Sequence, residues 1–222
     1  MLPKATVIFS AQRTAVLVRK KQRFFAQLFL KRCRANIFKI SVYPIIMFDV
    51  VIPNGNEEDF IDMALSSGYS QICFLVEDSR YSYASKRIGV KKALLVKSVN
   101  QISKSRKNFD FIFANAERKF FESKIDYIIN AELFDRKDSF HFKRTALNQV
   151  HAKLAKSNNI AVLFSFSNLL SNRRIQTLGR MFQNAILVKK YKLQSNAFSL
   201  TKDPTSMKSR NILDALIRVL GV

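Results

Sequence analysis

Ten basic and amide-bearing residues in the second half of the chain have the side chains best suited to binding a polyanion. Arginine and lysine neutralise phosphates, while asparagine and glutamine on the same surfaces can hydrogen bond to ribose or to base edges. This mixture is less expected of a membrane-surface protein, which needs only charge and an apolar wedge. The candidate binding residues are Lys143, Arg144, Asn148, Gln149, Arg173, Arg180, Asn184, Lys190, Lys208 and Arg210.

A predicted helix over 173–193 carries several of these side chains in a regular file. At about 100° per residue, an apolar stripe falls on one side of the helix: Ile175, Leu178, Phe182 and Ala185. A polar file falls nearly opposite: Arg173, Thr177, Arg180 and Asn184. We expect the stripe to hold the helix on the fold and the polar file to face RNA or a partner protein. The alternatives are an ordinary solvated face, a cap or loop contact for Asn184, and an ion pair with an acid for Arg180.

The net charge also indicates a polyanionic partner. The 222 residues include 38 Lys and Arg against 16 Asp and Glu, a formal net charge of +22. Such an excess opposes compaction by self-repulsion unless nucleic acid or an anionic membrane surface relieves it. The sequence has no run of 18 apolar residues, so we expect no membrane-spanning helix.

The sequence offers little material for cofactor or metal chemistry. Cys33 and Cys73 form neither a CxxC pair nor a disulfide framework, which favours a reducing compartment, and we expect a cytoplasmic protein. His141 and His151 are the only histidines, and five glycines form no phosphate-binding loop. We therefore expect no catalytic residue, metal ligand or cofactor on the chain itself.

Acidic residues at predicted strand ends are the exception that could hold Mg²⁺ through oxygen. Acids at strand–helix junctions more often cap helices, so we assign no metal site to them. These residues are Asp49, Glu77, Asp78, Glu132 and Asp135.

Residues 1–46 differ in composition from the rest of the chain. They hold ten Lys and Arg and no Asp or Glu. They could form a basic RNA-binding arm, an import presequence, or an extension included by a wrong choice of start. We favour the last interpretation, with Met47 as the start, because a predicted strand begins at Phe48 with no linker. The domains are then the extension, 1–46, and a folded unit, 47–222.

From Met47 onward, short apolar runs alternate with helical patterns. Their continuous Val, Ile, Phe and Leu content is typical of parallel strands buried on both faces. The predicted strands are 48–52, 71–76, 93–96, 110–115, 126–130, 160–166 and 196–200. Helix-length connections between them imply right-handed crossovers. A doubly wound open sheet and a barrel both fit this repeat. We prefer a TIM-barrel-like α/β fold, with a barrel that could be incomplete, because no strand reads as an edge.

The sequence contains signals for where several predicted helices begin and end. Asn56 is the expected N-cap of the first helix, and Gly68 is the expected C′ glycine after it. A helix over 143–156 should bury Leu147, Val150 and Leu154. The last helix, over 207–220, should bury three residues and close on a glycine: Ile212, Leu216, Leu220 and Gly221.

Three blocks of the sequence resemble one known family. They read KRTALNQVHAKLAKSNNIAVLFSFSNLL (143–170), GRMFQNAILVKKYKL (179–193) and AFSLTKDPTSMKSRNILDALIRVLGV (197–222). In this order they resemble the thirty-kilodalton protein subunit of archaeal and eukaryotic ribonuclease P, and the resemblance extends from Met47 to Val222. Two departures from the family pattern are Ala146 in place of a glycine and Lys208 in place of an arginine, which retains charge but loses bidentate phosphate geometry.

The resemblance implies a TIM-barrel-like fold related to the PHP phosphoesterases, without a metal site of its own. It implies a noncatalytic subunit of a hydrolase, an endoribonuclease whose catalytic RNA removes the 5′ leader of precursor tRNA with RNA-bound Mg²⁺. The implied partners are ribonuclease P RNA, precursor tRNA and a second small protein subunit. Two other functions stay open: a PHP-like metal-dependent phosphoesterase, and a basic RNA-binding module outside tRNA processing.

Overall fold

The computed structural model describes residues 48–133, 138 and 143–222. The predicted extension over 1–46, the predicted start at Met47, and the side chains of Cys33, Asp135 and His141 lie outside the described residues.

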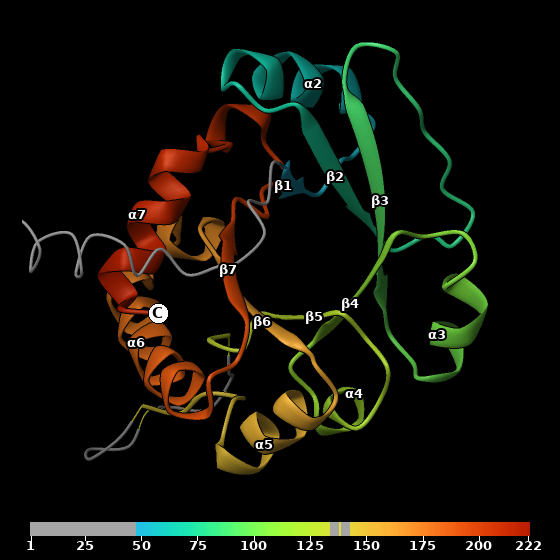
Figure 1. Ribbon diagram of the computed structural model, residues 1–222. Helices are drawn as coiled ribbons and strands as arrows, with labels where there is room; N and C mark the ends of the chain where they lie inside the picture. The colour runs from blue at the N-terminus through green and yellow to red at the C-terminus, as the bar shows by residue number, and fades with distance from the viewer. Residues whose placement is uncertain (1–47, 134–137, 139–142) are drawn as a thin grey trace, which may run out of the picture. The chain divides into compact units, whose positions relative to one another are not determined.

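Seven parallel strands form one sheet in the order of the chain, each hydrogen bonded to the next (Figure 1). They are β1 (Phe48–Val51), β2 (Gln71–Val76), β3 (Gly89–Val96), β4 (Phe111–Asn115), β5 (Tyr127–Ile129), β6 (Ala161–Ser165) and β7 (Ser195–Phe198). All seven predicted strands are confirmed. Their continuous apolar runs are explained by burial on both faces, since every residue of β1 and of β6 is buried.

The sheet curls into a nearly closed barrel. Just beyond β7, the backbone N–H of Leu200 donates to the Val50 carbonyl over 2.8 Å, and the Ile52 N–H donates to the Thr201 carbonyl over 2.9 Å. These bonds bring the end of β7 against β1, so the edges of the sheet meet. The barrel is therefore confirmed over the open, doubly wound alternative.

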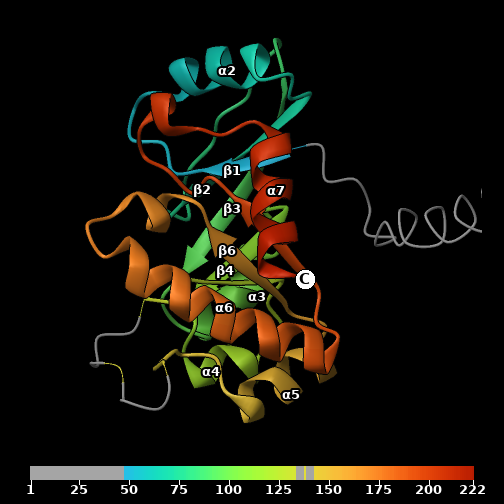
Figure 2. The same cartoon turned by 90° about the vertical axis from the view of Figure 1, so that its left-hand side faces the viewer.

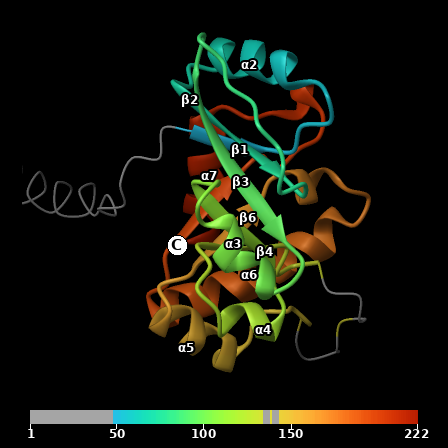
Figure 3. The ribbon, with the colours of Figure 1, turned by 90° about the vertical axis from the view of Figure 1, so that its right-hand side faces the viewer.

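Helices surround the barrel on the outside (Figure 1). They are α2 (Glu57–Ser66), α3 (Asn100–Ser105), α4 (Arg118–Phe121), α5 (Gln149–Ser157), α6 (Arg174–Tyr191) and α7 (Arg210–Leu220), with the 3-10 turns η1 (Ser167–Leu170) and η2 (Pro204–Ser206). Figure 2 shows α6 and α7 on one side of the barrel, and Figure 3 shows β3 and α3 on the other.

Aromatic rings fill the inside of the barrel. The Phe48 ring of β1 stacks on Phe111 of β4 at 5.4 Å and on Phe198 of β7 at 5.7 Å between ring centroids. Outside the barrel, a second layer of core packs strands against helices, and buried Phe164 of β6 shares it with Met181 of α6. The phenylalanine-rich strand runs therefore form core on both sides of the sheet.

Two helices begin later than predicted. α5 begins at Gln149 instead of Lys143, because Asn148 has extended backbone and its side chain accepts from the His151 N–H at 2.8 Å, which caps the helix there. Val150 is consequently exposed instead of buried. α7 begins at Arg210 instead of 207, because Ser209 is extended, and Ile212 is exposed although it was expected in the core.

Helix ends elsewhere follow the predictions in part. Gly68 has φ +78° after α2, and Gly221 has φ +74° after α7. Both are in the left-handed conformation, which strains residues with a Cβ but not glycine. Asn56 precedes α2 as expected, but its side chain makes no cap bond to the helix. Its amide instead donates to the Lys202 carbonyl at 3.3 Å.

Candidate functional site

Asp138 is the centre of a polar cluster that gathers three of the predicted binding residues. Arg180 Nε donates to Asp138 Oδ1 over 3.0 Å, and the Arg144 backbone N–H donates to the same oxygen over 3.0 Å. Lys143 Nζ lies 3.6 Å from Oδ2, which also accepts from Gln176 Nε2 over 3.3 Å. Desolvation raises the pKa of Asp138, but the bonds from Arg144, Arg180 and Gln176 outweigh it and hold the pKa below its usual value.

The orientation of α6 is the reverse of the predicted one. Arg180 is only 6% exposed and Thr177 and Asn184 are buried, whereas Ile175 is 84% exposed. The expected outward polar file therefore points inward, apart from Arg173, which is exposed at the N-terminal end of α6. Of the stripe predicted to face the core, only Ala185 is fully buried.

Polar partners explain why Arg180 on this face of α6 can be buried. Arg180 Nη1 donates to the Glu132 carbonyl over 3.2 Å, in addition to its ion pair with Asp138. Buried polar groups are stable where they are hydrogen bonded, and these partners lie beyond the end of β5. The buried side of α6 also includes the apolar residues Met181 and Val188. The alternative of an Arg180 ion pair with an acid is thereby confirmed.

A second network lies at the carboxyl ends of β4, β5 and β6. Asn130 Nδ2 donates to Asn115 Oδ1 over 3.0 Å, and Asn168 Nδ2 donates to Glu132 Oε1 over 2.8 Å and to Asn130 Oδ1 over 3.2 Å. Burial raises the pKa of Glu132, and the bond from Asn168 opposes that rise. The sequence prediction missed the asparagines and Asp138, although Asn115 and Asn130 directly end strands, where TIM-like barrels place functional side chains.

Lys208 and Arg210 lie in another region, where α7 begins beside β1 and β7. The Lys208 N–H donates to Ser199 Oγ over 2.9 Å, and the Ser199 N–H donates to Asp49 Oδ1 over 2.9 Å. Burial raises the pKa of Asp49 to about 6, against bonds from Ser199 and Val50 that lower it. Arg210 pairs with Asp214 one turn along α7, at 2.6 Å.

The remaining predicted residues are spread along the surface of α5 and α6. Asn148 caps α5, and Gln149 Oε1 accepts from the Tyr191 hydroxyl at 3.5 Å. Arg173 and Lys190 are both exposed, at opposite ends of α6. They lie about 25 Å apart along the helix axis. The ten predicted residues therefore form no single site: one group surrounds Asp138, a second lies at α7, and the others are dispersed.

The acidic strand-end residues are engaged in ion pairs or hydrogen bonds. Glu77 pairs with Lys97 and Asp78 with Arg80, while Asp49 accepts backbone N–H groups. His151 Nδ1 lies 2.7 Å from the Ala146 carbonyl oxygen, and its ring stacks on a phenylalanine. Within the described residues no group of three or more His, Cys, Asp or Glu side chains is placed to hold a metal ion.

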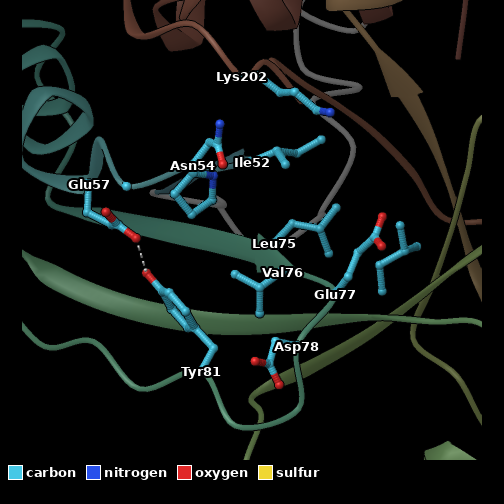
Figure 4. Close-up of a pocket in the computed structure, with 12 residues that line it drawn as sticks. Ile52, Asn54, Glu57, Leu75, Val76, Glu77, Asp78, Tyr81 and Lys202 are labelled. Carbon is cyan, nitrogen blue, oxygen red and sulfur yellow. Dashed lines mark hydrogen bonds between the residues drawn. The ribbon is translucent and has the colours of Figure 1, made fainter.

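A pocket of about 560 Å³ opens near the carboxyl ends of β1, β2 and β3 (Figure 4). Its apolar lining includes Ile52 and Leu75, and its polar rim includes Asp78 and Lys202. The Tyr81 hydroxyl donates to Glu57 Oε1 at 3.2 Å across one side of it. None of the ten predicted residues lines the pocket, so sequence and pocket indicate different parts of the molecule.

No helix in the described ranges is long and apolar enough to cross a membrane.

Comparison with known proteins identifies the fold. The chain matches no family model, and no curated protein matches it in sequence. A chain in the cryo-EM structure of archaeal ribonuclease P with mature tRNA has a TM-score of 0.62 at 20% identity, over 78% of this chain and 82% of that one. Histidinol phosphate phosphatase from Lactococcus lactis, solved with zinc, L-histidinol and phosphate, has a TM-score of 0.56 at 12% identity, over 78% and 93%. The chain shares its TIM-barrel-like α/β fold with these two structures.

Proposed function

We propose that this chain is a noncatalytic protein subunit of ribonuclease P. It assists the catalytic RNA in endonucleolytic removal of the 5′ leader of precursor tRNA. The observation that carries the proposal is the fold shared with a chain of archaeal ribonuclease P over most of both chains. The three family-like sequence blocks add to it, because together they cover most of the region from α5 through α7.

The chain binds RNA by its basic surface and leaves the chemistry to the RNA. Exposed Arg173 and Lys190 neutralise phosphates directly, as do the partly exposed Lys208 and Arg210. Mg²⁺ held by the RNA performs the hydrolysis, and the chain supplies no ligand to it. The partners are ribonuclease P RNA, precursor tRNA and a second small protein subunit.

Buried Arg180 acts indirectly in this proposal. It holds Asp138, which in turn binds the backbone of Arg144 and pairs with Lys143. Arg180 therefore positions two cationic side chains without touching RNA itself. Asn184, which is fully buried, has the same internal location on α6 and no direct RNA contact.

Reconstitution of the holoenzyme tests this function. Ribonuclease P RNA and the other protein subunits are assembled with and without this chain, and 5′ cleavage of precursor tRNA is measured at fixed Mg²⁺. Omission should lower cleavage, and addition of the chain should restore it. Equal cleavage in both mixtures would overturn the proposal.

Two further measurements separate the alternatives. Turnover of a generic phosphoester by the purified chain with Mn²⁺ or Zn²⁺, and without RNA, would identify a phosphoesterase instead. Sequencing of the RNA that copurifies with the chain should return ribonuclease P RNA and precursor tRNA. Other RNAs in their place would indicate an RNA-binding module outside tRNA processing.

A further inference from the structure

The outer face of α6 carries an apolar stripe that nothing in the described part of the chain covers. Ile175 is 84% exposed, Ile186 62% and Phe182 39%. Their spacing of seven and four residues places the three side chains within an arc of about 40°. In Figure 2, α6 runs along the side turned to the viewer, and no described helix or strand is drawn in front of it.

The stripe is not left exposed because α6 lacks a core contact. The other side of α6 already packs on the barrel through Met181, Leu187 and Val188, which are buried. α6 is therefore apolar on two faces. Isolated exposed apolar side chains are ordinary on protein surfaces, but three in helical register form a continuous surface of the kind that binds partners.

The charged residues of α6 beside the stripe are all basic. Arg174 at the start of α6 and Lys189 near its end are exposed, and the helix contains no Asp or Glu. A binding partner must therefore bury apolar surface and present negative charge at the edge of the contact.

Charge and chemistry argue against a second copy of this chain, residues 1–46 and RNA. A second copy of this chain would set one basic rim against another, and residues 1–46 carry ten Lys and Arg with no acid. RNA could pair with the rim, but it offers no surface that gains from desolvating isoleucine, since protein–RNA contacts use phosphate pairing, hydrogen bonds and aromatic stacking. A different protein satisfies both requirements.

We propose that the outer face of α6 is the docking surface for a second, different protein, which lays an apolar helix or strand flanked by Asp and Glu along Ile175, Phe182 and Ile186. The contact follows the helix-in-groove and helix-packing modes, in which anchors recur at helical spacing. It does not depend on the RNA role proposed above, because other side chains carry that role.

Site-directed photocrosslinking tests the class of the occupant. A benzophenone amino acid replaces Ile186 in the full chain, the native complex is irradiated, and the adduct is treated separately with ribonuclease and protease. We expect a protein adduct whose crosslinked peptide is rich in Asp and Glu. The same probe at Leu65, an exposed position on α2, should give none. An adduct to RNA, to another copy of this chain or to a basic peptide, or no adduct at Ile186, overturns the proposal.

Variants then test the contact with the purified, crosslink-identified protein. Ile175→Gln with Ile186→Gln should weaken its binding at least tenfold. Arg174→Glu with Lys189→Glu should weaken it too, most strongly at low salt. Leu65→Gln is the matched control and should bind as the wild type does.

RNA affinity distinguishes failure of this inference from failure of the proposed function. The Ile175→Gln, Ile186→Gln variant should keep wild-type affinity for precursor tRNA, because neither residue is a proposed RNA contact. Reduced RNA affinity with unchanged protein binding would overturn the docking surface and assign the face to RNA.

Discussion

Arg180 and Asp138 form an ion pair between a helix and a segment 42 residues away in sequence, with 3.0 Å between Nε and Oδ1. Both side chains are largely shielded from solvent. Removing one partner of a buried ion pair costs more stability than removing one partner of a surface pair, because a charge is left buried without its partner. The pair therefore ties the Asp138 cluster to α6, and we expect it to affect stability before it affects RNA binding.

Arg180→Ala should destabilise the folded unit by roughly 3 kcal/mol, because Asp138 and the Glu132 carbonyl would lose their buried donor. Urea unfolding followed by circular dichroism measures the change. Arg174→Ala, at an exposed position on the same helix, is the control and should change the unfolding free energy by less than about 0.5 kcal/mol. Equal stability of both variants would contradict the buried pair.

Asp49 should make stability fall as pH rises. Its pKa is about 6 in the fold against a usual 3.8, because burial disfavours the carboxylate. The folded state therefore binds more protons than the unfolded state between these values, and the stabilisation present below pH 4 is lost as pH rises through 6. The loss amounts to at most about 3 kcal/mol.

Asp49→Asn isolates this contribution, since the amide oxygen still accepts from Ser199 and Val50. Unfolding free energies at pH 4.5 and pH 7.5 are compared for both proteins. The wild type should lose stability relative to the variant on going to pH 7.5. A constant difference between them would show that Asp49 titrates normally.

Phe164→Ala should cost about 3–5 kcal/mol, because the ring is fully buried between β6 and α6 and its removal leaves a cavity. Phe182→Ala removes the same ring from an exposed position and should cost less than about 1 kcal/mol in the isolated chain. Chemical denaturation of the two variants side by side gives the comparison. A larger loss from Phe182 would mean that α6 is turned the other way.

Gly179→Ala should raise stability by about 0.5–1 kcal/mol, the difference in helix propensity between the two residues. The new Cβ would meet only the Lys143 side chain, at 3.4 Å from Cε, which is ordinary contact with a flexible chain. Thermal unfolding measures the gain. A loss of stability instead would show that the Lys143 side chain cannot move away from the new Cβ.

Arg173→Ala with Lys190→Ala should leave folding intact and weaken RNA binding. Removing one side chain that neutralises a phosphate lowers the slope of log affinity against log salt by about one unit, so the double variant should lower it by about two. Filter binding of precursor tRNA over a series of salt concentrations measures the slope. Lys104→Ala on α3, across the barrel, is the control (Figure 3). An unchanged slope in the double variant would remove these two residues from the RNA surface.

The parallel strands follow from the sequence alone, because burial on both faces leaves a continuous apolar run within each strand. Each run such as Ala161–Ser165 is apolar almost throughout, and only a strand covered on both faces uses such a run. Helix-length spacing then forces parallel crossovers. Gly68 and Gly221 mark helix ends for a similarly local reason, since their backbone conformation disfavours side chains. The closure into a barrel was decided by the hydrogen bonds between the end of β7 and β1.

The orientation of α6 was decided only in the tertiary structure. The helix has two apolar faces, so its period predicts a helix but cannot say which face is buried. That choice depends on Asp138 and the Glu132 carbonyl, which satisfy Arg180 from distant parts of the chain. With these partners, burying the arginine is stable and Ile175 is left in solvent. Such long-range pairing leaves no periodic signal in a single sequence, so the Asp138 cluster and the exposed stripe become visible only when the barrel brings their elements together.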